Sequence, residues 1–403
     1  MNDFPPTTTV LDLSAKNLDH LPQWVTTLKN LKVLFLSNNN FKKIPQEINQ
    51  LENLEFLGMK SCQLTTLEIS SLPKNIRWLT LTDNKINKIP KDIGQLEKLE
   101  KLLLAGNQIT AIPEEIIACK NLALLRISAN KLKKSPFSLI KKLPNLAWYA
   151  DAGNPFSLKK TQQEMNIPKV KWTDMKIKSM LGASAQNKIY QASVKGLKDE
   201  VAIKIFGNKI TSDGYPQDDL MISILAGKHP NIIETLFEIV DLPNKKFAIA
   251  LKKIDEKFST LGLPPSFDTC YRDTFAKNKT FTNNFILKVL QQVSSAYTHL
   301  HRLSIMNGDL YAHNILTNQN GDTYLGDFGA ASLYDKNLEP EREAIDVRAF
   351  GFLIADLLSH TPAIKTESFN KLEHLKNLCL TIEIEKRPNF KKINSILKNI
   401  QLN

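Results

Sequence analysis

Apolar residues recur at a regular interval through the N-terminal part of the chain. Lines that begin at Leu31, Leu54, Ile76, Leu99, Leu122 and Leu146 follow one another every 22 to 24 residues. Each line has roughly the form L-x-x-L-x-L-x-x-N-x-L-x-x-I-P-x-x-I-x-x-L-x-x, which predicts a short strand, a turn and an irregular or 3₁₀ segment. A proline opens most of these segments, namely Pro22, Pro45, Pro90, Pro113 and Pro136. No single unit can bury its apolar face alone, so about seven units are expected to stack into a solenoid.

The ninth position of each line is small and polar in nearly every unit. It is occupied by Asn39, Cys62, Asn84, Asn107, Asn130 and Asn154. The pattern is identified as that of leucine-rich repeats, in which such side chains form a ladder that satisfies backbone groups of neighbouring coils. An unsatisfied buried group would cost about 1 to 3 kcal/mol. We therefore interpret Cys62 as a substitution in this ladder rather than as a reactive thiol.

The strand residues that do not point inward should line a concave surface. They include Phe35, Phe56, Trp78, Lys101, Leu103, Arg126 and Trp148. Exposed aromatic rings together with arginine are enriched at interface hot spots, so this face is predicted to bind a protein substrate or partner. The alternative is that some of these rings cap the core or pack on a second domain.

In the C-terminal part, polar residues interrupt two short apolar stretches at a suggestive spacing. Asp309 and Asn314 lie within Ile305-Met-Asn-Gly-Asp-Leu-Tyr-Ala-His-Asn-Ile-Leu316, and Asp327 lies within Gly326-Asp-Phe-Gly329. Carboxylate and amide oxygens suit Mg²⁺ and the orientation of a phosphate acceptor. The two stretches resemble the catalytic loop and the Asp-Phe-Gly motif of the eukaryotic-type protein kinase family. The resemblance implies that Asp309 orients the acceptor hydroxyl and that Asn314 and Asp327 hold the metal ion, Mg²⁺ or else Mn²⁺.

Further kinase elements are expected upstream, and matching stretches occur in the right order. Val201-Ala-Ile-Lys204 is similar to the strand whose lysine contacts the ATP phosphates, and Leu181 to Ala192 is similar to a degenerate phosphate-covering loop. The resemblance implies catalytic work for Lys204 and an ATP site formed with Leu181, Gly182, Ser184, Ile189, Ala202, Asp219 and Leu316. Asp219 would pair with Lys204, either alone or with help from Asp218. The alternative is that both acids only favour a helix start.

Two scaffold roles also follow from the resemblance. Asp346, in Ile345-Asp-Val-Arg-Ala-Phe-Gly351, would hold the backbone of the catalytic loop, and Arg387 would pair with Glu341.

The departures from the kinase pattern are informative. Asn307-Gly308 replaces the family's His-Arg, and Tyr311 replaces a lysine, although His313 could supply a donor nearby. Ser332 and Tyr334 are the only hydroxyl residues between Asp327 and Glu341. Activity is therefore predicted not to need activation-loop phosphorylation. The replacement of the lysine weakens a choice between serine/threonine and tyrosine as the acceptor.

Together these motifs predict two domains. We expect an α/β solenoid of leucine-rich repeats at residues 1–157, a linker at 158–171, and an α+β two-lobed protein kinase-like domain at 172–403. The length of 403 residues agrees with two or three domains.

Charge and composition limit which partners and which cellular location are expected. The formal net charge is +12, but lysines are spread through both halves and no nucleic-acid motif is visible, so nucleic acid is not an expected partner. The four cysteines show neither metal spacing nor a pattern of pairs, which suits a reducing compartment. No signal peptide and no transmembrane segment is predicted, because the longest apolar run is too short. A cytoplasmic location is expected, in the protein's own cell or in a host.

The combination of modules is similar to a group of bacterial leucine-rich-repeat protein kinases. This resemblance implies an ATP-dependent protein kinase, more naturally for serine or threonine than tyrosine, whose repeats recruit the substrate. The degenerate glycine loop, Asp219 and Tyr311 leave open an ATP-binding pseudokinase. A scaffold that acts through its repeats is a third alternative.

Overall fold

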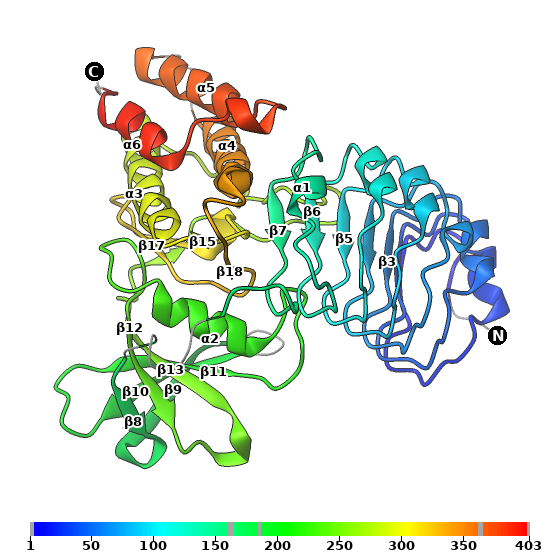
Figure 1. Ribbon diagram of the computed structural model, residues 1–403, viewed down its shortest axis with the longest axis horizontal. Coiled ribbons are helices and arrows are strands. Elements are labelled where there is room, and N and C mark those ends of the chain that lie inside the picture. Colours follow the sequence, from blue (N-terminus) through cyan, green and yellow to red (C-terminus); the bar gives the residue numbers. More distant parts are fainter. Residues whose placement is uncertain (1–3, 160–164, 166, 184–186, 362–365, 401–403) are drawn as a thin grey trace.

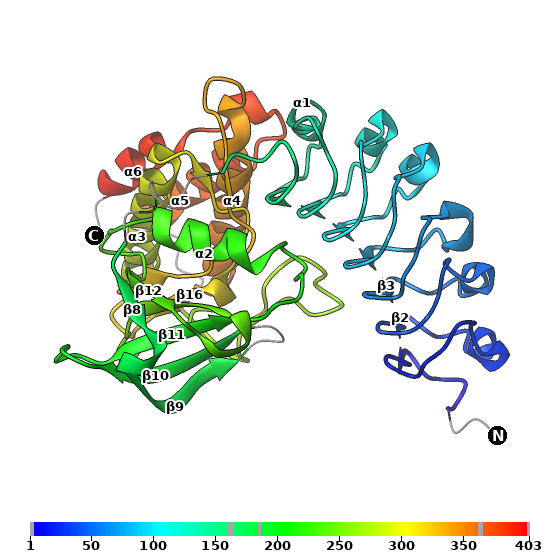
Figure 2. The same ribbon diagram turned by 60° about the horizontal axis from the view of Figure 1, so that its bottom comes forward.

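The computed structural model describes residues 4–159, 165, 167–183, 187–361 and 366–400. The chain forms an arc of repeats and a two-lobed domain, and the hollow side of the arc faces the two lobes (Figures 1 and 2). This arrangement agrees with the predicted fold class, a solenoid followed by an α+β domain.

The repeats form a seven-stranded parallel sheet in chain order. Its strands are β1 (Val10–Asp12), β2 (Val33–Phe35), β3 (Phe56–Gly58), β4 (Trp78–Thr80), β5 (Lys101–Leu103), β6 (Leu124–Arg126) and β7 (Trp148–Ala150). The middle residue of each strand points into the solenoid core, and its two neighbours face the concave side, because side chains alternate along a strand.

The convex side carries one short helical segment for each turn of the solenoid. These are η1 (Gln23–Thr27), η2 (Gln46–Gln50), η3 (Ile69–Ser71), η4 (Lys91–Gln95), η5 (Glu114–Ala118) and α1 (Phe137–Ile140). All but η3 begin directly after one of the five predicted prolines. Proline suits this position because the first N–H groups of a helix have no partner within it.

The predicted polar ladder is confirmed. Asn107, for example, donates from Nδ2 to the carbonyls of Leu81 and Leu104 at 2.9 and 3.0 Å and accepts from the N–H of Ile86 at 3.0 Å. Cys62 takes the same place with its thiol 3.1 Å from the carbonyl of Leu36. Burial raises the pKa of this thiol, which agrees with a structural role.

The smaller lobe of the second domain is a six-stranded sheet with the order β8-β12-β13-β11-β10-β9. The strands are β8 (Lys169–Lys171), β9 (Met175–Ala183), β10 (Lys188–Val194), β11 (Val201–Phe206), β12 (Thr235–Val240) and β13 (Phe247–Lys252). Helix α2 (Pro216–Leu225) packs on this sheet, and the 3₁₀ segments are η6 (Trp172–Asp174) and η7 (Pro243–Lys245). β8 pairs with β12, so residues expected to belong to the linker join the sheet of this lobe.

The larger lobe is mainly helical. Its helices are α3 (Asn283–Arg302), α4 (Glu343–Ser359), α5 (Glu367–Cys379) and α6 (Phe390–Lys398). Thr282, Thr366 and Asn389 cap α3, α5 and α6 through their side-chain oxygens. Short strands form two small sheets, one from β14 (Ser259–Thr260), β16 (Ile315–Thr317) and β17 (Thr323–Leu325), the other from β15 (Ile305–Met306) and β18 (Ser332–Leu333). The 3₁₀ segments are η8 (Ala312–Asn314), η9 (Pro340–Arg342) and η10 (Ile384–Lys386).

The two domains share buried apolar clusters. Met306, Tyr334 and Ile345 of the larger lobe belong to the same cluster as the solenoid core. Leu103, Leu124 and Trp148 of the repeats belong to the cluster at the centre of the larger lobe. Over the described residues, no helix combines the length and apolar character needed to cross a membrane.

Candidate active site

The predicted catalytic loop runs between β15 and β16, and α4 binds its backbone through Asp346. Asp346, which is fully buried, accepts hydrogen bonds from the backbone N–H groups of Asn307 at 2.9 Å and Gly308 at 2.8 Å. The predicted scaffold role of Asp346 is confirmed. The loop is therefore fixed by a buried carboxylate that has two backbone donors in place of water.

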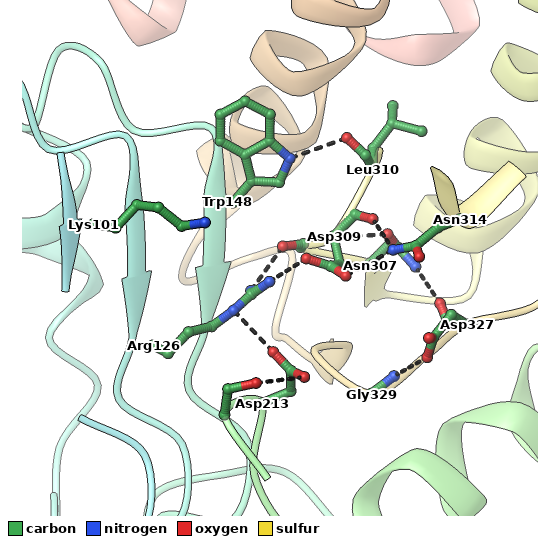
Figure 3. A network of polar contacts seen from close by, with 12 residues as sticks. Lys101, Arg126, Trp148, Asp213, Asn307, Asp309, Leu310, Asn314, Asp327 and Gly329 are labelled. Atoms are coloured by element: carbon green, nitrogen blue, oxygen red, sulfur yellow. Dashed lines mark hydrogen bonds and ion pairs between the residues drawn. The ribbon is translucent and has the colours of Figure 1, made fainter. Parts of the chain in front are cut away.

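Asp309 and Asn314 lie in contact within this loop. Asn314 donates from Nδ2 to the backbone carbonyl of Asp309 at 3.1 Å and to its Oδ2 at 2.8 Å. Only 20% of the Asp309 side chain is exposed. In Figure 3, Asn314 and Asp327 lie on the side of Asp309 that faces away from the repeats.

Lys204 projects from β11 to a carboxylate on α2. Its Nζ lies 2.7 Å from Oδ2 of Asp219 and 3.9 Å from Oδ1 of Asp327. Of the two candidate acids, Asp219 is thus the one in contact with Lys204. The Ser223 hydroxyl also donates to Oδ1 of Asp219, at 3.2 Å. Burial disfavours the Lys204 ammonium, but the neighbouring carboxylates outweigh burial and raise the pKa of Lys204.

Asp327 offers an exposed carboxylate near Lys204. Its side chain is 54% exposed, and its Oδ1 accepts from the N–H of Gly329 at 3.1 Å. The described residues hold no cluster of three His, Cys, Asp or Glu side chains that could bind a metal ion alone. Mg²⁺ usually takes one or two carboxylates together with water and substrate phosphates, so Asp327 and the amide oxygen of Asn314 fit such a site.

The other residues predicted to bind nucleotide lie on the sheet of the smaller lobe, except Leu316, which lies on β16 of the larger lobe. Gly182 pairs with Ile189 in the β9–β10 hairpin, and Ile189 in turn faces Lys204 across β10 and β11. Ala202 and Ile189 contact the same apolar cluster, Leu181 is 45% exposed, and Leu316 is half-buried on β16. Ser184 lies outside the described residues.

The concave face of the repeats contacts the second domain, which the sequence left as the alternative to partner binding. Phe35, Phe56 and Trp78 surround Phe267 of the larger lobe, with ring centroids 5.8, 5.1 and 5.7 Å from it. Lys101 donates to the carbonyl of Cys270 at 3.1 Å. The alternative that these rings pack on the second domain is confirmed.

Arg126 of the repeats reaches the catalytic loop itself. Its guanidinium donates to the carbonyl of Gly308 at 2.8 Å, forms a short ion pair with Oδ1 of Asp309, and lies 3.1 Å from Oδ1 of Asp213 (Figure 3). Burial raises the pKa of Asp213 to about 6, although Arg126 opposes this shift. Reasoning from the sequence placed Arg126 on the concave face but missed this contact, because residues 126 and 309 share no local pattern.

Trp148 covers the next part of the loop. Its ring stacks on Tyr311 with centroids 4.6 Å apart and planes 4° apart, and its Nε1 donates to the carbonyl of Leu310 at 3.0 Å. The unusual Tyr311 thus belongs to the contact between domains.

One predicted ion pair is wrong. Glu341 pairs with Lys141, which follows α1 in the last but one repeat, at 2.8 Å, while Arg387 donates to the backbone carbonyls of Ala344 and Thr381 at 2.9 and 2.8 Å. The docked repeat brings a lysine to the carboxylate, so Arg387 is free to cap backbone groups instead.

Both hydroxyl residues of the activation segment are buried. The Ser332 hydroxyl lies 3.3 Å from a guanidinium nitrogen of Arg342, and the Tyr334 hydroxyl lies 3.0 Å from Nδ1 of His301. Ser332 is 4% exposed and Tyr334 is 3% exposed, so in this arrangement another kinase could not reach their hydroxyl groups to phosphorylate them.

Comparison with known families agrees with the two-part architecture. The profile of the Protein kinase domain matches residues 175–401, and that of the Leucine rich repeat matches residues 6–64 and 74–146.

Several curated proteins are similar to the chain. A probable LIM domain-containing serine/threonine-protein kinase of Dictyostelium discoideum is 23% identical over 55% of this chain and 26% of its own length. Cyclin-dependent kinase 11.1 of Caenorhabditis elegans is 27% identical over 38% of this chain and 20% of its own length. L-type lectin-domain containing receptor kinase V.5 of Arabidopsis thaliana is 23% identical over 45% of this chain and 26% of its own length.

The chain thus spans about a quarter of the length of these relatives. The matched family covers more than half of the chain, from β9 to the end of α6, and contains each described residue of the predicted site. The chain belongs to the protein kinase family and carries leucine-rich repeats ahead of its kinase domain.

Proposed function

We propose that this protein is an ATP-dependent protein kinase that transfers the γ-phosphate of ATP to a protein hydroxyl, serine or threonine in preference to tyrosine. The observation that carries the proposal is the Lys204–Asp219 ion pair at 2.7 Å, with Asp327 3.9 Å from the same lysine. The contact between Asp309 and Asn314 accompanies it. These residues would supply a cation for the phosphates, a proton acceptor and two metal ligands. The kinase relatives support the same reaction class.

Each residue would have a distinct task. Lys204 would hold the α- and β-phosphates, and Asp309 would orient the acceptor hydroxyl and take its proton. The hydroxyl oxygen would bond to the γ-phosphorus as the bond to the bridging oxygen breaks, and ADP would leave with that oxygen. A divalent ion, Mg²⁺ or Mn²⁺, would neutralise phosphate charge when bound at Asn314 and Asp327. Leu181, Gly182, Ile189, Ala202 and Leu316 would enclose the nucleotide.

Activation-loop phosphorylation would not be required. The burial of Ser332 and Tyr334 supports this part of the proposal, as does the absence of the family's arginine at Gly308. Phosphatase treatment of the purified protein should therefore leave its activity unchanged, and a loss of activity would contradict this part.

The repeats would recruit a protein substrate or partner. The concave face combines the cations of Lys101 and Arg126 with aromatic rings, so an acidic protein segment with an aromatic side chain would fit it. Such a partner would have to displace the kinase domain from Phe35, Phe56, Trp78, Leu103, Arg126 and Trp148. The four cysteines are all unpaired and buried, which supports a reducing, cytoplasmic setting. Membership of the bacterial leucine-rich-repeat kinases is likewise proposed, from the sequence resemblance alone.

A phosphotransfer assay tests the proposed reaction. Labelled ATP, Mg²⁺ or Mn²⁺ and a mixture of protein acceptors would be incubated with the full chain and with Asp309→Asn and Lys204→Ala. We expect each substitution to lower transfer about 100-fold or more, because proton transfer and phosphate positioning are lost. Asp255→Asn is the matched control. It removes an exposed carboxylate outside the proposed active site, so it should keep wild-type activity.

Nucleotide binding is measured in parallel by thermal stabilisation. Stabilisation by ATP and Mg²⁺ without transfer in any variant would favour the pseudokinase, and the lack of both responses would favour a scaffold. Analysis of the labelled amino acid would decide between serine, threonine and tyrosine.

A further inference from the structure

The carboxylate that is proposed to take the acceptor's proton has no free oxygen in this arrangement. Oδ1 of Asp309 is paired with the guanidinium of Arg126, and Oδ2 accepts from Asn314 at 2.8 Å. Arg126 is 2% exposed and is also bonded to the carbonyl of Gly308 and to Asp213. An acceptor hydroxyl that bonds to Oδ1 would need the position that the guanidinium occupies.

The surface around Asp309 is covered as well. Trp148 lies flat on Tyr311 and stacks on Phe352 with centroids 5.3 Å apart. Leu103 is also buried between the repeats and the larger lobe. A polypeptide acceptor would meet the last three strands of the repeats before it reached the catalytic loop.

The end of the activation segment is fixed by the same domain. Arg342 and Asp151 form a buried pair with two hydrogen bonds, at 3.0 and 2.5 Å, and each side chain is 2% exposed. Arg348 on α4 donates to the side-chain and backbone oxygens of Asn145 at 2.7 and 3.3 Å. The repeats thus bind the segment of the kinase domain that lies beside the catalytic loop.

The docked repeats explain why Gly308 stands where the kinase family has an arginine. A Cβ atom added to Gly308 would lie 2.1 Å from the backbone oxygen of Tyr149, and the glycine has a φ of +68°. The arginine that the family carries here could not be accommodated while β7 is docked. Gly308 and Tyr311 are therefore both adapted to the repeats.

The residues proposed to bind the nucleotide phosphates have other partners by contrast. The side chain of Asp327 is 54% exposed, and Lys204 is paired with Asp219 rather than with a residue of the repeats. The proposed phosphate-binding lysine is thus held within the kinase domain, whereas the proposed proton acceptor Asp309 is held by the repeats.

From these contacts we propose that the repeats are an autoinhibitory domain: their concave face excludes the protein acceptor, and Arg126 blocks Asp309 until the repeats undock. This regulation rests on the proposed function, since it concerns the same carboxylate. An occupant of the concave face would activate the enzyme by competing with the kinase domain for Arg126 and Trp148.

The test uses the full chain with Arg126→Ala, Arg126→Glu and Trp148→Ala, and with Lys134→Ala as a control. Lys134 is an exposed cation of the same domain, so its removal should change nothing. Transfer to a protein acceptor, ATP binding, and hydrogen exchange of residues 305–311 are measured in each. We expect Arg126→Ala to raise transfer about tenfold or more, and Arg126→Glu further, because each shifts the population towards the undocked state. ATP affinity should stay within about threefold of wild type, and exchange in the loop should become faster.

The double variant Arg126→Ala/Asp309→Asn tests whether the gain in phosphate transfer depends on Asp309. If it does, this double variant must be inactive. Arg126→Lys keeps a charge but loses the forked geometry, so it should give a smaller gain and serves if Arg126→Ala does not fold.

The outcomes separate this inference from the proposed function. Wild-type transfer that depends on Asp309, with no gain or a loss in folded Arg126 variants, would overturn autoinhibition alone and make Arg126 a positioning residue. Faster exchange in the loop without transfer in any variant would overturn both.

Discussion

At the scale of single residues, titratable groups around the catalytic loop depend on close partners. His313 lies 2.7 Å from Oδ1 of Asp273, whose side chain is 2% exposed. Burial disfavours the imidazolium, but the hydrogen bond and charge of Asp273 outweigh it and raise the pKa of His313. His313, considered as a donor in place of the missing lysine, is thus held by a carboxylate of its own lobe.

This pair gives the stability of the protein a defined dependence on pH. A raised pKa in the folded state means that the stabilisation is complete below the unfolded pKa of about 6.5 and is lost as pH rises through the higher folded value. His313→Gln should lower the free energy of unfolding by about 1 to 3 kcal/mol at about pH 6 and by less at about pH 8.5. Chemical denaturation at both pH values measures this difference. A difference that grows with pH would contradict the assignment.

At the scale of elements, the repeats depend on a ladder of buried side chains. Each ladder asparagine satisfies backbone groups of two successive turns, as Asn130 does with the carbonyls of Leu104 and Ile127. The ladder adds to the backbone hydrogen bonds that join successive strands and close the turns. This element was predictable because its period is local in the sequence.

Asn107→Ala should therefore destabilise the protein by about 1 to 3 kcal/mol, because the buried N–H of Ile86 loses its partner. The carbonyls of Leu81 and Leu104 each lose one donor but keep a second, from Asn84 and Asn130. Gln108→Ala changes the exposed neighbour and should cost less than about 0.5 kcal/mol. Equilibrium unfolding in urea compares the two variants. Equal losses of stability would show that the ladder bonds contribute little.

At the scale of the whole molecule, buried ion pairs join the domains. Asp151 and Arg342 are separated by 191 positions and are both almost fully buried. Such a pair contributes little net energy when intact, but removal of one partner leaves a buried charge with less compensation. Arg342 would then keep only its ion pair with Glu339 among its described carboxylate partners. The docked arrangement is thus sensitive to the loss of either residue.

Asp151→Ala should cost about 3 to 5 kcal/mol of docking or folding free energy, whereas the double variant Asp151→Leu/Arg342→Met should recover most of it. Thermal unfolding reports the stability, and small-angle scattering reports whether the molecule expands. Glu367→Ala, which breaks the exposed Glu367–Lys371 pair, is the control and should cost less than about 1 kcal/mol. A double variant less stable than Asp151→Ala would contradict the argument.

The sequence alone determined the features that are written in short spacings. The repeat period predicted the solenoid and its asparagine ladder, and the motifs around Lys204, Asp309 and Asp327 predicted the kinase fold and the Lys204–Asp219 pair. Asp346 was assigned correctly because its partners belong to the same family pattern. Hydrophobic periodicity and motif spacing are local properties, so they can be read without coordinates.

Only the tertiary structure decided what the concave face contacts. Arg126 and Asp309 are 183 positions apart, and the local sequence around one residue does not indicate that it contacts the other. The pairing of Glu341 with Lys141 instead of Arg387 has the same origin, since it depends on where the repeats dock. Docking of two folded domains is set by the shape and charge of whole surfaces, and these exist only after the chain has folded.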